Sequence, residues 1–139
     1  MPTGWSLSKD AVNLSLERDT TDFQSGPASL KLRATDAAGQ GNASINFPPV
    51  DTPFNLSAHV KAQGNLKEAL LALQIFDQNW KQVSWINFAD LKGTNSTGGQ
   101  WKEFKQQITL PAEAKRCFLL LIFKVEGQIN LDEVRLGQP

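Results

Sequence analysis

The sequence predicts an all-β protein, an antiparallel β-sandwich (jelly roll) of about nine strands in two sheets. Three observations predict it. Short segments alternate apolar and polar residues with a period of two, as in "AVNLSLER" at 11–18. Clusters of Gly, Pro, Asn, Asp and Ser separate these segments at regular intervals. No segment carries a convincing helical pattern, and 139 residues is the length of one domain, which we expect to span 1–139.

The first half of the chain contains four predicted strands. In the fourth, "FNLSAHVKA", Leu56, Ala58 and Val60 alternate with Ser57, His59 and Lys61, so the apolar set points to the core and the polar set points away from it. The four segments are 11–18, 28–34, 42–47 and 54–62.

The second half contains five more predicted strands. The segment 68–77, "EALLALQIFD", is rich in helix-forming residues, but its length and the turn residues on both sides favour a strand. It forms a hairpin with 82–88, and a tight turn at 126–127 joins the last two strands. The five segments are 68–77, 82–88, 101–110, 116–125 and 128–136.

Two of these strands, 69–76 and 117–123, are apolar on both faces. One face of each belongs to the core of a two-sheet sandwich. The other face is either covered by loops or forms the floor of a surface that binds something.

Composition excludes several classes of function. Lys plus Arg and Asp plus Glu both number 14, and no basic stripe indicates a nucleic-acid partner. The longest apolar run, "CFLLLIF", is too short to span a membrane. Cys117 is the only cysteine, so we expect a buried small apolar residue rather than a disulfide or a cysteine-rich metal site.

Four motifs occur in one order: "SGPASLKL" at 25–32, "FNLSAHVKA" at 54–62, "GGQWKEFKQQITLP" at 98–111 and "GQINLDEVRL" at 127–136. Together they resemble the jelly-roll carbohydrate-binding modules of the family 4/9/22 type. The chain departs from that pattern in two ways: the usual first strand with a Phe-Glu pair is absent, and there is no tyrosine.

The resemblance implies a non-catalytic module that binds plant-type polysaccharide of the β-glucan or xylan class in a concave groove. It implies that the module targets a covalently linked glycoside hydrolase to its substrate. The start "MPTGWSLSKD" has no apolar leader, so the residues alone allow either a cytoplasmic protein or a module of a longer exported chain. The resemblance favours a secreted or extracellular module.

Strand alternation predicts the ligand-binding residues. If the buried set of each strand faces the core, three successive strands present one outer surface with an aromatic ring beside hydrogen-bonding groups, as a sugar site requires. An exposed tryptophan in the turn "DQNWKQ" is a further candidate. The predicted ligand-binding residues are Trp85, Trp80, His59, Gln74, Asn87 and Lys61.

The resemblance also implies a structural calcium ion, with Asp132 of the last strand as one ligand. Asp19 and Asp22, in "ERDTTDFQSG", are candidate partners because calcium takes several oxygen ligands. Leu131 and Val134 cannot share one face of a regular strand, so we expect a bulge near Asp132.

Two other functions stay open. The chain could be a β-sandwich that packs against a catalytic domain or another protein partner, with an apolar patch and no polar-flanked groove. An enzyme is less favoured, because there is no nucleophile motif and no obvious pair of carboxylates on facing strands.

Overall fold

The computed structural model describes residues 5–23, 28–35, 39–47 and 52–137. Positions 25–27 of the "SGPASLKL" motif lie outside these ranges. Within them the chain forms strands and turns and no helix, so no helix there could cross a membrane. The strands are β1 (Trp5–Leu7), β2 (Leu14–Asp19), β3 (Ser29–Ala34), β4 (Gly39–Phe47), β5 (Phe54–Gln63), β6 (Asn65–Phe76), β7 (Gln82–Asp90), β8 (Gly93–Thr94), β9 (Lys102–Ile108), β10 (Arg116–Val125) and β11 (Gln128–Gly137).

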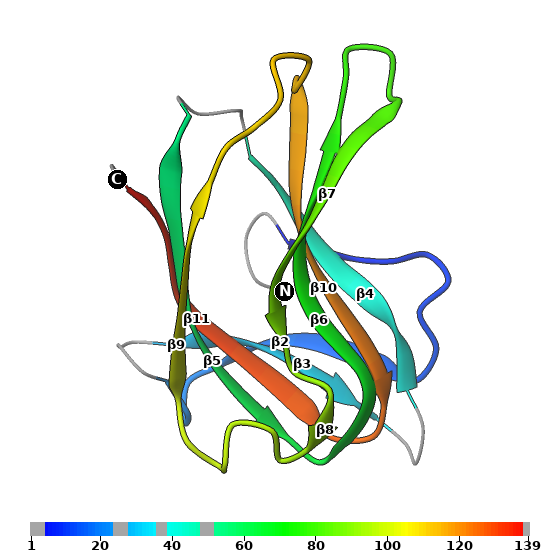
Figure 1. Ribbon diagram of the computed structural model, residues 1–139. Helices are drawn as coiled ribbons and strands as arrows, with labels where there is room; N and C mark the ends of the chain where they lie inside the picture. Colours follow the sequence, from blue (N-terminus) through cyan, green and yellow to red (C-terminus); the bar gives the residue numbers. More distant parts are fainter. Residues whose placement is uncertain (1–4, 24–27, 36–38, 48–51, 138–139) are drawn as a thin grey trace.

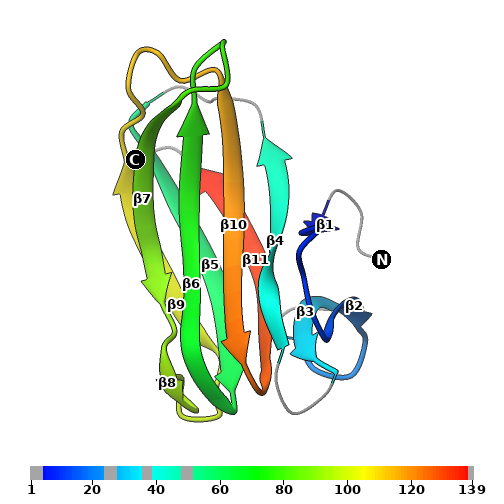
Figure 2. The ribbon, with the colours of Figure 1, turned by 90° about the vertical axis from the view of Figure 1, so that its right-hand side faces the viewer.

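The strands make two antiparallel sheets that pack face to face (Figures 1 and 2). Sheet A has the order β1-β4-β10-β6-β7, with the short β8 also paired to β6. Sheet B has the order β2-β3-β11-β5-β9. Figure 2 looks at sheet A, with sheet B behind it. The predicted all-β sandwich is confirmed.

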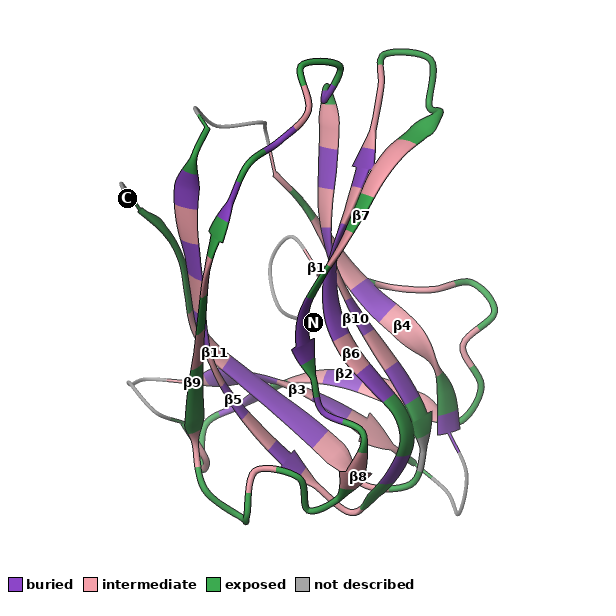
Figure 3. Cartoon of the chain, in the orientation of Figure 1, coloured by how far each residue is buried: buried purple, intermediate pink, exposed green. Residues whose placement is uncertain are grey.

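The core lies between the sheets, where each strand contributes alternate residues. In β5 the buried positions are Leu56, Ala58 and Val60, as the sequence predicts. In β6, Leu71 and Leu73 are fully buried and face them from the other sheet. Figure 3 shows this as bands of buried (purple) residues that alternate with less buried ones along the strands. Each fully buried large aliphatic side chain contributes about 1.5–3 kcal/mol, so burial of this shared layer fixes which face of each strand remains outside.

The predicted strands all occur, and β6 is a strand despite its helix-forming composition, because both neighbours in sheet A pair with it along its length. The structure adds β1 and β8, which the sequence did not indicate. They have three and two residues, too few to display an alternating pattern. The predicted bulge near Asp132 is confirmed, since the register with β5 shifts between Asp132 and Arg135.

Two turns that switch between the sheets touch at one end of the sandwich. The turn from β5 to β6 contains Gly64, and the turn from β10 to β11 contains Gly127. Gly127 has φ of 117°, and a Cβ added there would lie 2.1 Å from the backbone oxygen of Gln63. This close approach requires glycine, and it holds together the point where the chain enters β6 and the point where it leaves β10.

Candidate functional site

The outer face of sheet A carries a mixture of apolar and amide side chains. The registers place Phe118 of β10 beside Asn46 of β4 and Gln74 of β6, and Gln74 in turn beside Trp85 of β7. One row further along the strands, Leu120 lies between Ser44 and Ala72. This is the second apolar face that the composition of β6 and β10 predicts, and loops do not cover it completely.

Three neighbouring hollows lie on this face. Their volumes are about 350, 270 and 240 Å³. Asn42 lines the first and the second, and Glu68 and Ile122 line the second and the third, so neighbouring hollows share walls. We call the three hollows together the sheet A groove. Its lining residues include Asn42, Ser44, Gln74, Phe76, Trp80, Phe118 and Leu120 in the first hollow, Asp10, Gln40, Glu68 and Lys124 in the second, and Leu70, Asn87 and Asp90 in the third.

One end of the groove is a cluster of aromatic rings. The ring of Trp80 lies with its centroid 5.7 Å from that of Phe76 and 6.2 Å from that of Phe118, and Phe76 and Phe118 meet edge to face at 5.8 Å. The Arg116 guanidinium carbon lies 4.1 Å from the Trp80 centroid, a cation–π contact. Trp80 remains 55% exposed, so much of its surface is free to contact a ligand.

The turn between β6 and β7 holds Trp80 in this position. The Asp77 carboxylate accepts the backbone N–H groups of Asn79 and Lys81, and the Asp77 N–H donates to the Lys81 carbonyl. Trp80 has φ of 63°, a left-handed conformation that costs an L-residue about 1–2 kcal/mol. Glycine would fit the backbone better, so packing and turn hydrogen bonds must outweigh this strain to present the ring.

Trp85 points away from the core, as predicted, and is 38% exposed on the edge strand β7. Its indole N–H donates to the Asn87 side-chain oxygen at 2.7 Å, which fixes the ring orientation. The neighbouring Gln74 amide donates to Gln82 at 3.0 Å. Gln74, Asn87 and Trp80 line hollows of the groove, and Trp85 lies beside them at its β7 edge.

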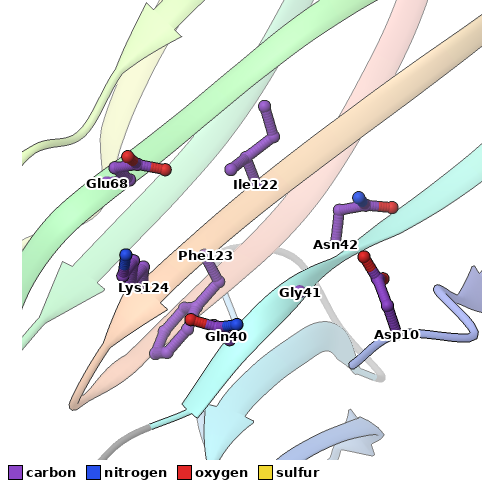
Figure 4. Close-up of a pocket in the computed structure, with 8 residues that line it drawn as sticks. All are labelled: Asp10, Gln40, Gly41, Asn42, Glu68, Ile122, Phe123 and Lys124. Carbon is purple, nitrogen blue, oxygen red and sulfur yellow. The ribbon is translucent and has the colours of Figure 1, made fainter. Parts of the chain in front are cut away.

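The far end of the groove is charged. Figure 4 shows Asp10, from the segment before β2, and Glu68 of β6 at opposite sides of the second hollow, with Lys124 of β10 on the same side as Glu68. The registers place Lys124 directly between Glu68 and Gln40. The structure thus brings two carboxylates to one hollow, which the sequence did not predict because Asp10 lies outside any strand.

The prediction that His59 and Lys61 share this surface is wrong. Both lie on β5, which pairs with β9 and β11 in sheet B, so they face the opposite side of the sandwich from Gln74, Trp85 and Asn87. Successive strands 54–62 and 68–77 are neighbours in sequence, but the turn at Gly64 carries the chain from one sheet to the other.

On sheet B these two residues have protein partners. Lys61 Nζ donates to Asp22 at 2.8 Å. The two ring nitrogens of His59 lie 3.8 Å from a Glu103 oxygen and 3.9 Å from a Glu133 oxygen. A role for either residue in the sheet A groove is therefore excluded by position.

The predicted calcium ligands are paired with donors instead. Asp22 accepts the Lys61 ammonium and the Trp101 indole N–H, the latter at 3.1 Å. The Asp19 carboxylate accepts the Asn130 amide at 3.0 Å and lies 3.6 Å from Lys31 Nζ. The described residues hold no group of three or more His, Cys, Asp or Glu side chains able to bind a metal ion.

The set of Asp19, Asp22 and Asp132 therefore does not fit calcium, which needs several converging oxygens rather than nearby ammonium groups. Asp132 lies further along β11, opposite His59, and its carboxylate accepts the Glu133 N–H at 2.8 Å. The predicted ligand set is not assembled in the described part of the chain. Calcium binding itself stays a prediction.

Asp19 is the anionic centre of the network on sheet B. Burial raises the pKa of Asp19, but hydrogen bonds from Thr21, Asn130 and the Asp22 backbone outweigh it and hold that pKa well below its ordinary value. The carboxylate is thus charged at neutral pH and is structural. Burial also raises the pKa of the Cys117 thiol, which agrees with its predicted place in the core.

Solved structures share this fold. The N-terminal CBM22-1–GH10 part of endo-1,4-β-D-xylanase 10B of Clostridium thermocellum, complexed with xylohexaose, matches with a TM-score of 0.70 and 16% identity over 97% of this chain. The CBM22-1 xylan-binding domain of Xyn10C from Paenibacillus barcinonensis matches with a TM-score of 0.65 and 17% identity over 98% of this chain and 87% of that domain. The chain has the jelly-roll fold of a carbohydrate-binding module.

The enzymatically active domain of tailspike protein 4 of bacteriophage CBA120 also matches, with a TM-score of 0.68 and 16% identity over 97% of this chain. The chain spans 19% of that tailspike chain and 26% of the xylanase chain. No protein-family model and no curated protein matches the sequence. Identities this low show a shared fold and do not identify a ligand.

Proposed function

We propose that this chain is a non-catalytic module that binds polysaccharide along the sheet A groove. The observation that carries the proposal is the aromatic cluster of half-buried Phe76 and Phe118 with exposed Trp80, beside a row of amide and hydroxyl groups. The faces of pyranose rings are patches of C–H groups that stack on aromatic rings, and planar amides hydrogen-bond to the hydroxyls at the ring edges.

The first hollow has the composition that this recognition needs. Its volume of about 350 Å³ falls in the range of small-molecule sites, and its polar groups are Asn42, Ser44 and Gln74, all uncharged. The aromatic rings supply the apolar contact, and these three side chains supply donors and acceptors on either side of Phe118 and Leu120. The first hollow therefore suits the ring and the hydroxyl groups of a sugar residue.

The proposed ligand is a plant-type polysaccharide of the β-glucan or xylan class. The shared fold supports this, because the matched CBM22 domain of Paenibacillus barcinonensis is named as xylan-binding. One matched structure joins such a module to a GH10 module, which supports a covalently linked glycoside hydrolase. Such a protein acts on polysaccharide outside the cell, so we propose a secreted or extracellular module.

The enzymatic alternative rests on Asp10 and Glu68, which line one hollow. Glycosidases need two carboxylates facing one bond at a defined separation. Here Lys124 is the direct neighbour of Glu68 in the sheet and lines the same hollow, and the aromatic cluster lines the first hollow. The arrangement favours binding over hydrolysis.

Native affinity electrophoresis tests the proposal. Wild-type protein, Trp80→Ala and Trp85→Ala are run in gels containing soluble β-glucans, xylan, xyloglucan, mannans or alginate. His59→Gln is the matched control, because His59 lies on the opposite sheet. Reducing-end release from each polysaccharide is measured in parallel with wild type and Glu68→Gln.

We expect at least one glycan to retard wild type and His59→Gln, with less retardation of Trp80→Ala and no release of reducing ends. If no glycan retards the wild type, the proposal is wrong. If His59→Gln loses retardation and Trp80→Ala keeps it, the binding face is sheet B. Release of reducing ends that Glu68→Gln abolishes would establish the enzyme instead.

A further inference from the structure

Arg116 is a cation without an anion at the aromatic end of the groove. It is the first residue of β10, in register with Phe76, and its guanidinium carbon lies 4.1 Å from the Trp80 centroid. Within the described part of the chain the guanidinium makes no ion pair and no hydrogen bond, and its Nε is buried without a partner.

Arg116 as a whole is half-buried, and the buried Nε is the atom left without a partner. A guanidinium carries five N–H donors, and a polar group removed from water is stable only when it is hydrogen-bonded. Asp77, in the same turn as Trp80, has its Oδ1 engaged by the N–H groups of Asn79 and Lys81. Its carboxylate stabilises the turn and forms no ion pair with Arg116. Contact with the Trp80 ring compensates for part of the desolvation of Arg116 but uses none of its N–H groups.

The neighbouring hollow is uncharged, so Arg116 supplies the positive charge beside its aromatic surface. The rings of Phe76, Phe118 and Trp80 lie within 6.2 Å of one another, and Arg116 contacts the last of them. A sugar ring stacked on this cluster would bring a substituent at its edge towards the guanidinium. Guanidinium groups match the planar shape of a carboxylate and bind it through two parallel hydrogen bonds.

We propose that the Trp80–Arg116 end of the groove binds an acidic sugar, a pyranose carrying a carboxylate, within the bound polysaccharide. This inference rests on the proposed function and names the class of glycan at one end of the same site. Trp80 and the two phenylalanines contact the sugar ring, and Arg116 binds its carboxylate. Neighbouring sugars of the polysaccharide occupy the remainder of the groove.

The test uses pairs of ligands that differ in the carboxylate alone. Glucuronic-acid-substituted xylan, alginate and polygalacturonate are each compared with the same polymer after chemical reduction of its carboxyl groups to alcohols. Isothermal titration calorimetry with wild-type protein is done at low and at high salt. We expect at least one acidic polymer to bind about tenfold or more tightly than its reduced form, because hydrogen bonds to charged groups are the stronger kind. The difference should shrink at high salt as the charges are screened.

Variants of Arg116 locate the effect. Arg116→Gln should bind the acidic and reduced polymers equally, at the affinity of wild type for the reduced form, and Arg116→Lys should retain part of the discrimination. Equal binding of both forms by wild type overturns the inference while leaving polysaccharide binding intact. If Arg116→Gln loses affinity for the acidic and the reduced polymer by the same factor, the inference is also overturned, since Arg116 would then act only by holding Trp80. If no polymer of either kind binds, the proposed function fails as well.

Discussion

Replacement of Trp80 by glycine separates binding from stability. Trp80 adopts φ of 63°, which costs an L-residue about 1–2 kcal/mol and costs glycine nothing. The replacement also removes the contacts of the ring with Phe76, Phe118 and Arg116. Contacts of this kind are worth about 1–3 kcal/mol together. The two effects oppose one another, so the free energy of unfolding of Trp80→Gly should lie within about 2 kcal/mol of wild type.

The loss of affinity should be larger. An aromatic side chain offers roughly 250 Å² of surface, and Trp80 exposes 55% of its own. A sugar that covers half of the exposed part buries roughly 70 Å², worth about 2 kcal/mol at about 25 cal/mol per Å². Specific stacking adds about 0.5–1 kcal/mol, so the dissociation constant should rise about 60- to 140-fold.

The assay compares Trp80→Gly with Trp80→Ala, because both lose the ring and only alanine keeps the left-handed strain. Urea denaturation should find the glycine variant more stable than the alanine variant by about 1 kcal/mol. Titration with the glycan that retards the wild type in the gel should find equally low affinities for the two variants. A glycine variant that binds as well as wild type would refute the role of the ring. An alanine variant at least as stable as the glycine variant would refute the account of the strain.

Three further predictions concern the sandwich that supports the groove. Asp19→Asn should lower the free energy of unfolding at pH 7 by about 2 kcal/mol, because the new NH2 group would replace an acceptor oxygen and face a donor, either the Asn130 amide or the Thr21 and Asp22 N–H groups. The pKa of Asp19 is depressed in the folded protein, so its contribution is present above the unfolded value of 3.8 and is lost as the pH falls; the difference between variant and wild type should shrink in acid. Gly127→Ala should cost about 3 kcal/mol or more, since its Cβ would lie 2.1 Å from the Gln63 oxygen at φ of 117°. Cys117 should react with a thiol reagent only after unfolding in urea, because the thiol is buried and burial raises its pKa.

The same experiments can contradict each of these three predictions. A constant difference between Asp19→Asn and wild type from pH 7 to pH 2 would mean that the carboxylate charge is not what stabilises the fold. A Gly127→Ala variant with an unchanged urea midpoint would mean that the two turns separate readily. Rapid labelling of Cys117 in the folded protein would mean that β10 opens in solution.

The sequence by itself determines the strands and most of their faces. Alternation predicts that Leu56, Ala58 and Val60 are buried, and that Trp85 points away from the core, because a strand can place only alternate residues in one layer. The composition of β6 and β10, apolar on both faces, predicts that one outer surface is partly apolar. Turn residues mark most of the boundaries between strands.

Only the tertiary structure decides which outer faces coincide. Alternation within a strand carries no information about which sheet the strand joins, and the turn at Gly64 moves β6 to the sheet opposite β5. His59 and Lys61 therefore leave the predicted site, and Asn42, Ser44 and Phe118, distant in sequence, enter it. The sequence likewise does not reveal that Arg116 has no ion pair among the described residues. Whether a charge is paired depends on the distances that folding sets between side chains remote along the chain.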